Sequence, residues 1–169
     1  MDITLTAQTN MPPRSALAPM LEDYYALMLA KFIHAGGPEL DRGGLIDEIW
    51  ADTEPYLPPQ GQIFLAHAGA RLVGCGFLRR IRPDAAEMKR LYVLPDCQGQ
   101  GLGRRLIEAR IDAARAIGLN DLYADTIVGN DDMLRLYDRL GFRRIERYPE
   151  NAHPPERSPW LVYLHRPVG

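Results

Sequence analysis

A glycine-rich turn joins a predicted strand directly to a predicted helix in the middle of the 169-residue chain. The strand is "EMKRLYV" (87–93), in which apolar and polar residues alternate, and "LPD" closes it. In the turn, "DCQGQGLGRRL" (96–106), glycine stands at every second position from 99 to 103. An amphipathic helix is predicted to follow at once over 103–117, with Gly118 at its end.

This arrangement is typical of anion binding, because the first N–H groups of a helix have no intrahelical partner and the helix dipole adds positive charge. Two familiar phosphate loops are excluded by spacing. A dinucleotide fingerprint needs G-x-G-x-x-G, but its third glycine position falls on Arg104 counting from Gly99, and on Leu106 counting from Gly101. A P-loop needs Gly-Lys-Ser/Thr, whereas Gly103 is followed by two arginines.

The remaining patterns predict a mixture of strands and helices. Helices are expected over 17–32, capped by Ser15, over about 41–51, and from Asn130 to Gly141. The expected strands are 2–8, 62–68, 72–81, 121–128, 142–148 and 160–166. Because strands and helices do not alternate strictly, we expect an α+β or mixed α/β sheet in one domain, not a doubly wound one.

Charge and composition narrow the classes of function. The formal charge is −2, but residues 1–62 carry −6 and the rest carries +4, which argues against nucleic acid and suits a small polyanion at the basic part. No apolar run is long enough to cross a membrane, and the first residues lack the features of a signal peptide, so we expect a cytoplasmic protein. The two cysteines and four histidines show no metal-ligand spacing, and no metal site is predicted.

The pattern Gln98-x-x-Gly101-x-Gly103, preceded by "MKRLYVLPD" and followed by "NDDMLRLYDRLGFRR" (130–144), resembles the signature of the GCN5-related N-acetyltransferases (GNAT family). The resemblance spans roughly residues 62–147 and departs at Met133, where alanine is usual. It implies a mostly antiparallel twisted sheet of six to seven strands, about four flanking helices and a splayed strand pair at the cofactor site. It also implies one N-acetyltransferase domain over 1–169, with a cofactor-binding core at about 62–147 and an acceptor site lined by helices at about 15–52.

The same resemblance assigns the residues that would hold acetyl-coenzyme A (acetyl-CoA), the implied co-substrate. The pantetheine arm would pair with the backbone of Leu91, Tyr92 and Val93, and Asn130 would meet the cofactor, although a helix N-cap is its alternative role. Arg104 or Arg105 could add a charged contact, and for Arg105 a solvated position is favoured. The pyrophosphate would be held by the backbone of Gln98, Gly99, Gln100, Gly101, Leu102, Gly103 and Arg104.

Two side chains are candidates for proton transfer. Tyr137 aligns with the tyrosine that protonates the departing thiolate in the family, and its alternative is a packed core aromatic. Glu87 stands where relatives often have an acid that draws a proton from the substrate ammonium, directly or through water, and its alternative is a solvated residue at the start of a strand. Cys97 suggests an acetyl-cysteine intermediate, but the resemblance implies direct attack without a nucleophile.

The resemblance therefore implies transfer of an acetyl group from acetyl-CoA to a primary amine of a small molecule or peptide, through a ternary complex. Acidic residues are frequent over 22–54 and would suit a basic acceptor. Two other classes stay open: a module that binds acetyl-CoA without turning it over, and a nucleotide-binding domain. A homodimer is possible, with "WLVYLHR" (160–166) as a potential edge strand.

Overall fold

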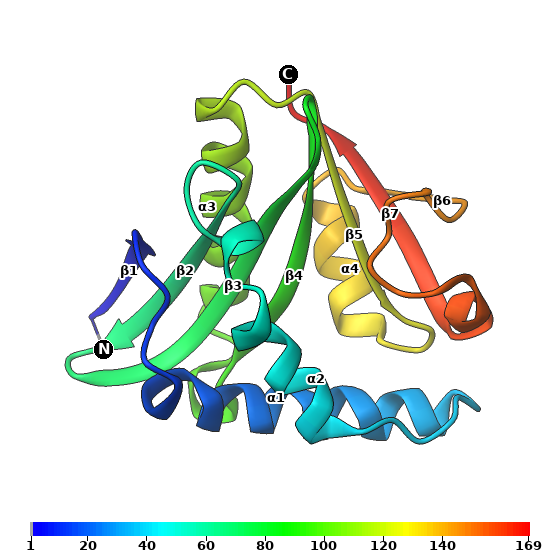
Figure 1. Ribbon diagram of the computed structural model, residues 1–169, viewed down its shortest axis with the longest axis horizontal. Coiled ribbons are helices and arrows are strands. Elements are labelled where there is room, and N and C mark those ends of the chain that lie inside the picture. Colours follow the sequence, from blue (N-terminus) through cyan, green and yellow to red (C-terminus); the bar gives the residue numbers. More distant parts are fainter. Residues whose placement is uncertain (1) are drawn as a thin grey trace.

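A seven-stranded mixed sheet forms the centre of the computed structural model, which describes residues 2–169 (Figure 1). The strand order is β1-β2-β3-β4-β5-β7-β6, and all neighbouring strands are antiparallel except β4 and β5, which are parallel. The mixed α/β fold and the expected strand number are thereby confirmed. The strands are β1 (Ile3–Gln8), β2 (Gly61–Ala68), β3 (Arg71–Arg82), β4 (Ala85–Val93), β5 (Asp121–Ile127), β6 (Arg143–Ile145) and β7 (Leu161–Pro167).

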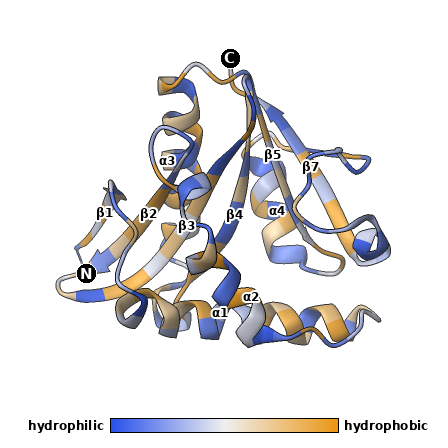
Figure 2. Cartoon of the chain, viewed as in Figure 1, coloured by the Kyte–Doolittle hydropathy of each residue, from blue (hydrophilic) through white to orange (hydrophobic). Residues whose placement is uncertain are grey.

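Helices cover both faces of this sheet. α3 (Leu102–Ala116) and α4 (Asp131–Arg139) lie on one face, behind the sheet in Figure 1, and α1 (Arg14–His34) and α2 (Arg42–Ala51) lie against the other. Hydrophobic and hydrophilic residues are interspersed along the strands and helices (Figure 2). Short 3-10 turns occur at Glu54–Tyr56, Pro95–Cys97 and Pro155–Trp160. The core on the α1 and α2 side includes Leu17, Leu21, Ile46, Ile49, Phe77 and Tyr92.

Three local expectations are wrong. β7 lies between β5 and β6, so the segment 160–166 is not an edge strand. The strand expected over 142–148 is only three residues long, because Tyr148 turns inward to pack on other tyrosines and the following Pro149 cannot donate to a ladder. α1 begins at Arg14 after Pro13 with no side-chain cap, so Ser15 is not its N-cap.

β4 and β5 separate halfway along their length. Their parallel pairing runs from Ala85 opposite Asp121 to Met88 opposite Ala124 and is not continued beyond that pair. In Figure 1 the two strands lie together at the top and diverge downward, and α1 crosses their open ends. The splayed pair expected at this place is therefore present, and it leaves one edge of the last residues of β4 without a strand partner.

A β-bulge interrupts β4 at the same level. The register with β3 shifts between Cys75, which is opposite Tyr92, and Phe77, which is opposite Lys89. Arg90, within this bulge, has φ +50° and is the one non-glycine residue with positive φ among residues 2–169. The bulge breaks the strict alternation of the strand, so that Lys89 and Arg90 both reach the α1 side of the sheet.

Candidate active site

A groove of about 640 Å³ lies at the open ends of the splayed strands, and we call it the turn groove. The end of β4, the glycine turn, the start of α4 and one side of α1 line it. Of the eleven residues that the sequence assigned to the cofactor, all but Gln100 line this groove. The fold thus brings together Leu91, Tyr92, Val93, Gln98, Gly99, Gly101, Leu102, Gly103, Arg104 and Asn130.

The glycine turn has the conformation that an anion-binding loop requires. Gly99 and Gly101 have φ of +75° and +77°, values that side-chain-bearing residues rarely adopt. Gln98 fastens the turn to the end of β4, since its Nε2 donates to the carbonyl of Val93 at 2.9 Å. α3 begins at Leu102, immediately after Gly101, so the first N–H groups of the helix have no intrahelical acceptor and lie at the groove.

The two arginines after the turn have different surroundings. Arg104 lines the groove and forms an exposed pair with Glu108 at 2.7 Å. Arg105 reaches away from the groove, where its Nη2 donates to the carbonyl of Ile3 at 2.9 Å and ties α3 to β1. Gln100 is exposed, and its amide contacts the carbonyl of Asp96 at 3.5 Å.

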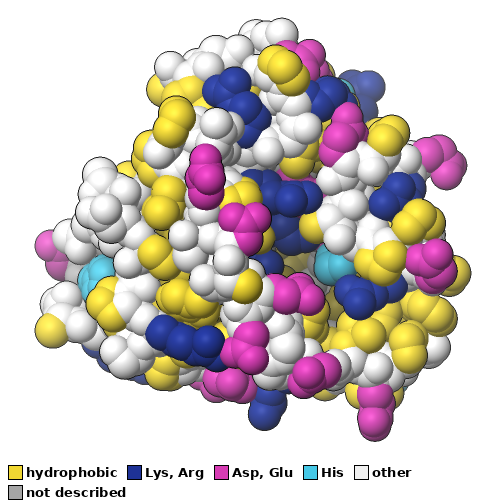
Figure 3. Space-filling view, in the orientation of Figure 1, with side chains coloured by type: hydrophobic (Ala, Val, Ile, Leu, Met, Phe, Trp, Pro, Cys, Tyr) yellow, Lys and Arg dark blue, Asp and Glu magenta, His cyan; other side chains and the backbone are white. Residues whose placement is uncertain are grey.

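A second, smaller cavity of about 180 Å³ lies between the sheet, α1 and the loop over 146–160, and we call it the inner cavity. Figure 3 shows basic side chains, a histidine and hydrophobic side chains gathered around a hollow on this face. Met28, Leu91, Asn130 and Met133 line both the turn groove and the inner cavity. The two spaces therefore meet, and they do so where β4 and β5 diverge.

Tyr137 lines the inner cavity from α4 and is 4% exposed. Its ring packs edge-on against Phe142. Burial raises the pKa of Tyr137, although the nearby positive charge of Arg110 acts in the opposite direction. The phenol therefore stays protonated at neutral pH and can donate a proton into the cavity.

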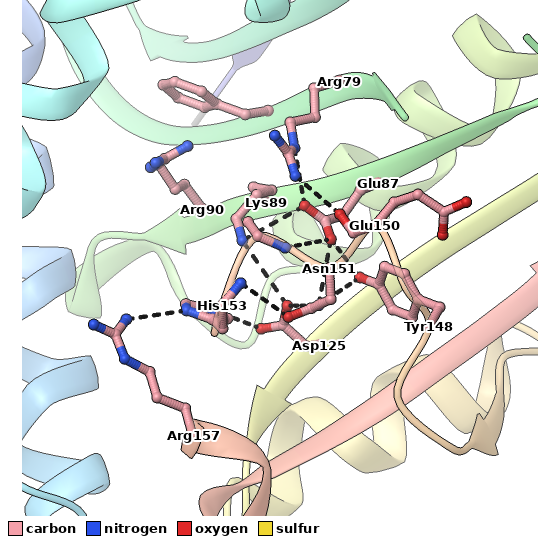
Figure 4. A network of polar contacts seen from close by, with 12 residues as sticks. Arg79, Glu87, Lys89, Arg90, Asp125, Tyr148, Glu150, Asn151, His153 and Arg157 are labelled. Carbon is pink, nitrogen blue, oxygen red and sulfur yellow. Dashed lines mark hydrogen bonds and ion pairs between the residues drawn. The ribbon is translucent and has the colours of Figure 1, made fainter. Parts of the chain in front are cut away.

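Glu87 lies in a buried polar cluster and does not line the inner cavity (Figure 4). It is 0% exposed, so the alternative of a solvated residue is wrong: the strand begins two residues earlier, and Glu87 faces the loop that covers the sheet. Its Oε1 accepts from Arg79 Nε at 3.0 Å and lies 3.7 Å from Lys89 Nζ. Its Oε2 accepts from the Tyr148 hydroxyl at 2.5 Å and from Asn151 Nδ2 at 3.3 Å.

A histidine–carboxylate pair, which the sequence patterns did not reveal, borders the inner cavity beside this cluster (Figure 4). His153 Nε2 lies 3.3 Å from Asp125 Oδ1, and Arg157 Nη1 lies 3.3 Å from His153 Nδ1. Because a guanidinium can only donate, Nδ1 is the acceptor and the proton of the neutral ring belongs on Nε2, facing Asp125. Burial alone would raise the pKa of Asp125, but Lys89 and His153 outweigh it and hold that pKa well below its ordinary value.

Asn130 precedes α4 and connects three elements. Its side chain does not cap the helix. Instead, Nδ2 donates to Thr126 Oγ1 at 2.8 Å, and Oδ1 accepts from Lys31 Nζ at 2.7 Å. These contacts hold β5, α4 and α1 together at the junction of the two spaces.

No helix among residues 2–169 is long and apolar enough to cross a membrane. In the same range, no three or more His, Cys, Asp or Glu side chains come together in a way that could hold a metal ion.

A splayed parallel strand pair, a glycine turn at a helix start and an adjoining cavity form the arrangement that the GNAT resemblance implied. The particular family follows from comparison with known proteins: residues 22–142 match the model of the acetyltransferase (GNAT) family, and the chain belongs to that family.

Individual relatives agree with this assignment. The chain is 28% identical over 150 residues to an uncharacterised N-acetyltransferase of Schizosaccharomyces pombe, covering 86% of this chain and 91% of that protein. It is 30% identical over 118 residues to the IAA acetyltransferase of Azospirillum brasilense, covering 69% and 74%.

Solved structures share the fold. A GNAT acetyltransferase from Staphylococcus aureus Mu50 superposes with a TM-score of 0.79 at 20% identity, over 99% of this chain and 100% of that one. A GNAT acetyltransferase from Elizabethkingia anophelis, solved with acetyl-CoA bound, gives a TM-score of 0.64 at 22% identity, over 98% and 97%.

Proposed function

We propose that this protein transfers the acetyl group of acetyl-CoA to a primary amine by direct attack in a ternary complex. The observation that carries the proposal is the junction of the turn groove with the inner cavity at Met28, Leu91, Asn130 and Met133. A thioester held in the groove and an amine held in the cavity would meet there without a covalent enzyme intermediate.

The turn groove fits acetyl-CoA in its chemistry. The unpaired N–H groups at the start of α3 suit a pyrophosphate, and the unpaired edge of Leu91–Val93 suits an extended arm that carries amides. The relative from Elizabethkingia anophelis was solved with acetyl-CoA bound, which supports the same ligand here. In this arrangement a backbone N–H of β4 stabilises charge on the thioester oxygen.

The inner cavity fits the acceptor. Helix α1, Leu40 and two residues of α2, Leu45 and Glu48, contribute much of its lining, which supports the proposal that residues 15–52 form the acceptor side. The acidic character of this segment does not extend into the cavity, because Glu48 is the only acidic residue of 22–54 that lines it. A basic acceptor is therefore not favoured by the lining.

Tyr137 is the proposed general acid for the departing thiolate. Its burial keeps the phenol protonated, and its place at the cavity brings it to the side where the acceptor and the thioester would meet.

The proton of the acceptor ammonium is proposed to leave through His153. The Nδ1 atom of His153 carries the lone pair that would take the proton once the amine replaces Arg157 Nη1, which lies 3.3 Å away, and Asp125 stabilises the imidazolium that forms. Direct action of Glu87, one of the two routes that the resemblance implies, would require several buried hydrogen bonds to open, because both of its oxygens already accept from neighbours. Action through water would need a path from Glu87 to the cavity, which Glu87 does not line. Glu87 instead orders Asn151 and Lys89 around Asp125.

Release of free thiol from acetyl-CoA over a panel of amines tests the function. Thiol release that depends on one class of amine supports it. Stabilisation by acetyl-CoA without turnover of any amine would instead support a binding module, and stabilisation by NAD or ATP but not by acetyl-CoA would support a nucleotide-binding domain.

Tyr137→Phe tests the general acid, and Tyr24→Phe is a matched control because Tyr24 is a second phenol of the same cavity. We expect kcat to fall at least tenfold only in Tyr137→Phe, with acetyl-CoA binding retained. An unchanged rate and pH profile in Tyr137→Phe would exclude Tyr137 as the acid.

A further inference from the structure

Arg90 places a guanidinium against the inner cavity without a carboxylate partner. Its Nε donates to the Tyr25 hydroxyl at 3.0 Å, and its Cζ lies 5.0 Å from the ring centroid of Tyr56 and 5.4 Å from that of Phe77. Its Nη1 is buried and has no hydrogen-bond partner. Within residues 2–169, no Asp or Glu oxygen lies within 4.0 Å of this side chain.

The other two cations around the cavity have side-chain partners, although only Lys89 has carboxylate partners. Lys89 lies between the carboxylates of Glu87 and Asp125, at 3.7 and 3.9 Å. Arg157 contacts the ring of His153. Arg90 therefore contributes positive charge that no described carboxylate neutralises.

Arg90 stays protonated although it is largely surrounded by protein. Burial acts to lower the pKa of Arg90, but the hydroxyls of Tyr25 and Tyr56 raise it on balance. Arg90 is partly exposed to the cavity, and its one buried, unpaired N–H group is costly unless an acceptor reaches it. A planar fork of this kind is suited to the two oxygens of a carboxylate.

The anion that Arg90 fits is not part of acetyl-CoA, because Arg90 lines the inner cavity and is not among the residues of the turn groove. The cavity also has an apolar wall formed by Met28, Leu29, Phe32 and Leu40. Its volume of about 180 Å³ is below the range of roughly 300–1,000 Å³ that is typical of drug-sized ligands.

From these observations we propose that the acceptor is a small amino acid with an apolar side chain, whose carboxylate binds Arg90. This inference rests on the proposed function and names its substrate class. The side chain of the acceptor packs on the apolar wall, and its amine faces His153 and the junction with the turn groove. Glu48 lies at the exposed rim and leaves the guanidinium free for the ligand.

Matched amines test the proposal. Leucine and phenylalanine are compared with their carboxamides and with isopentylamine and phenethylamine, which lack the carboxylate. We expect kcat/KM at least tenfold higher for the acids, mainly through KM. Equal kcat/KM for the acids, the amides and the simple amines would overturn the proposal.

Arg90→Gln should remove this preference by raising KM for the acids to the level of the amides, whereas Arg90→Lys should keep part of it. Arg157→Gln is the matched variant for the carboxylate preference, because Arg157 is another cavity cation without a carboxylate partner; its kcat can change for both acids and amides, because Arg157 also contacts His153. A preference lost in Arg157→Gln but retained in Arg90→Gln would refute the assignment. Acetyl-CoA binding, measured by thermal shift, verifies that each variant is folded.

A binding measurement separates this proposal from the proposed function. With coenzyme A present, leucine or phenylalanine should raise the melting temperature of the wild type but not of Arg90→Gln. Such a shift without turnover would support the carboxylate site and contradict the transferase. Turnover of simple amines with no effect of the carboxylate would support the transferase and contradict the carboxylate site.

Discussion

Gly101 and Gly118 flank the same helix, α3. Comparing an alanine variant at each position separates an effect on ligand binding at the turn from an effect on the stability of the fold. Gly101 precedes α3 with φ +77°, and Gly118 follows it with φ +75°. A Cβ added at either position would meet no atom within 4 Å. The only cost of substitution by alanine is therefore the free energy needed to hold a side-chain-bearing residue in the left-handed conformation, about 1–2 kcal/mol. The reduced entropy of the unfolded chain partly offsets this cost.

Both variants should thus lose about 1 kcal/mol of unfolding free energy, or about 2–4 °C in melting temperature for a chain of this size. A loss of this size leaves almost all molecules folded, so it does not by itself weaken a ligand. Only Gly101 lines the turn groove, so only Gly101→Ala adds a Cβ, or relaxes the backbone, beside the N–H groups that would hold the pyrophosphate. Loss of one hydrogen bond to a charged pyrophosphate is worth about 1.5–3 kcal/mol, which corresponds to an increase in the Kd of acetyl-CoA of about tenfold to a hundredfold.

Urea denaturation gives the unfolding free energies, and titration calorimetry gives the Kd of acetyl-CoA for both variants and the wild type. Gly118→Ala should match Gly101→Ala in stability and the wild type in Kd. If Gly101→Ala bound acetyl-CoA as tightly as the wild type, or if both variants weakened it equally, the turn would not be the pyrophosphate site.

Three further predictions concern the cavity and the cysteines. His153→Gln should lower kcat about a hundredfold, whereas Glu87→Gln should chiefly lower stability, by about 3 kcal/mol, because it removes the carboxylate beside Arg79 and Lys89; a hundredfold loss of kcat in Glu87→Gln with kcat retained in His153→Gln would return the base to Glu87. The stabilising charge of Asp125 is fully present above the unfolded pKa of about 3.9 and is lost as pH falls toward its lower folded pKa, so the acid unfolding of Asp125→Asn should depend less steeply on pH than that of the wild type. Burial raises the pKa of Cys75 to about 12, and Cys97 is also buried, so alkylation of the thiols in the native protein should be negligible. Cys97→Ala should retain activity, and mass spectra of the protein incubated with acetyl-CoA should show no acetylated cysteine.

Local patterns were sufficient to predict the part of the site that lies in one continuous segment. The alternation of 87–93, the glycines at 99–103 and the periodicity of 103–117 all describe neighbours in the sequence, and each corresponds to a structural element. The segment over 146–160 was less predictable, because its buried residues follow no period of 2 or 3.6. Tyr148 and Asn151 are instead held by Glu87, more than sixty residues earlier.

The cavity residues were missed for two physical reasons. His153 meets Asp125 only because the loop folds back over the splayed strands, and no spacing in the sequence encodes that contact. Arg90 follows Lys89 directly, and strict alternation would place the two on opposite faces of the sheet. The bulge, with φ +50° at Arg90, brings both to one cavity, and arginine is not a residue type that signals positive φ.

The splay of β4 and β5 links the two halves of the site. The next pair in their register would be Lys89 opposite Asp125, and here the backbone ladder stops and a side-chain ion pair of 3.9 Å takes its place. Because the strands separate at this point, the edge of β4 that borders the turn groove has no strand partner, and the inner cavity opens between the sheet and α1. The 146–160 loop then closes the cavity with Asn151 and His153. Under the proposed function, the turn before α3 would hold the acetyl donor, and this loop and the β4 bulge would contact the acceptor. Substitutions in the loop should then change acceptor preference without changing the affinity for acetyl-CoA.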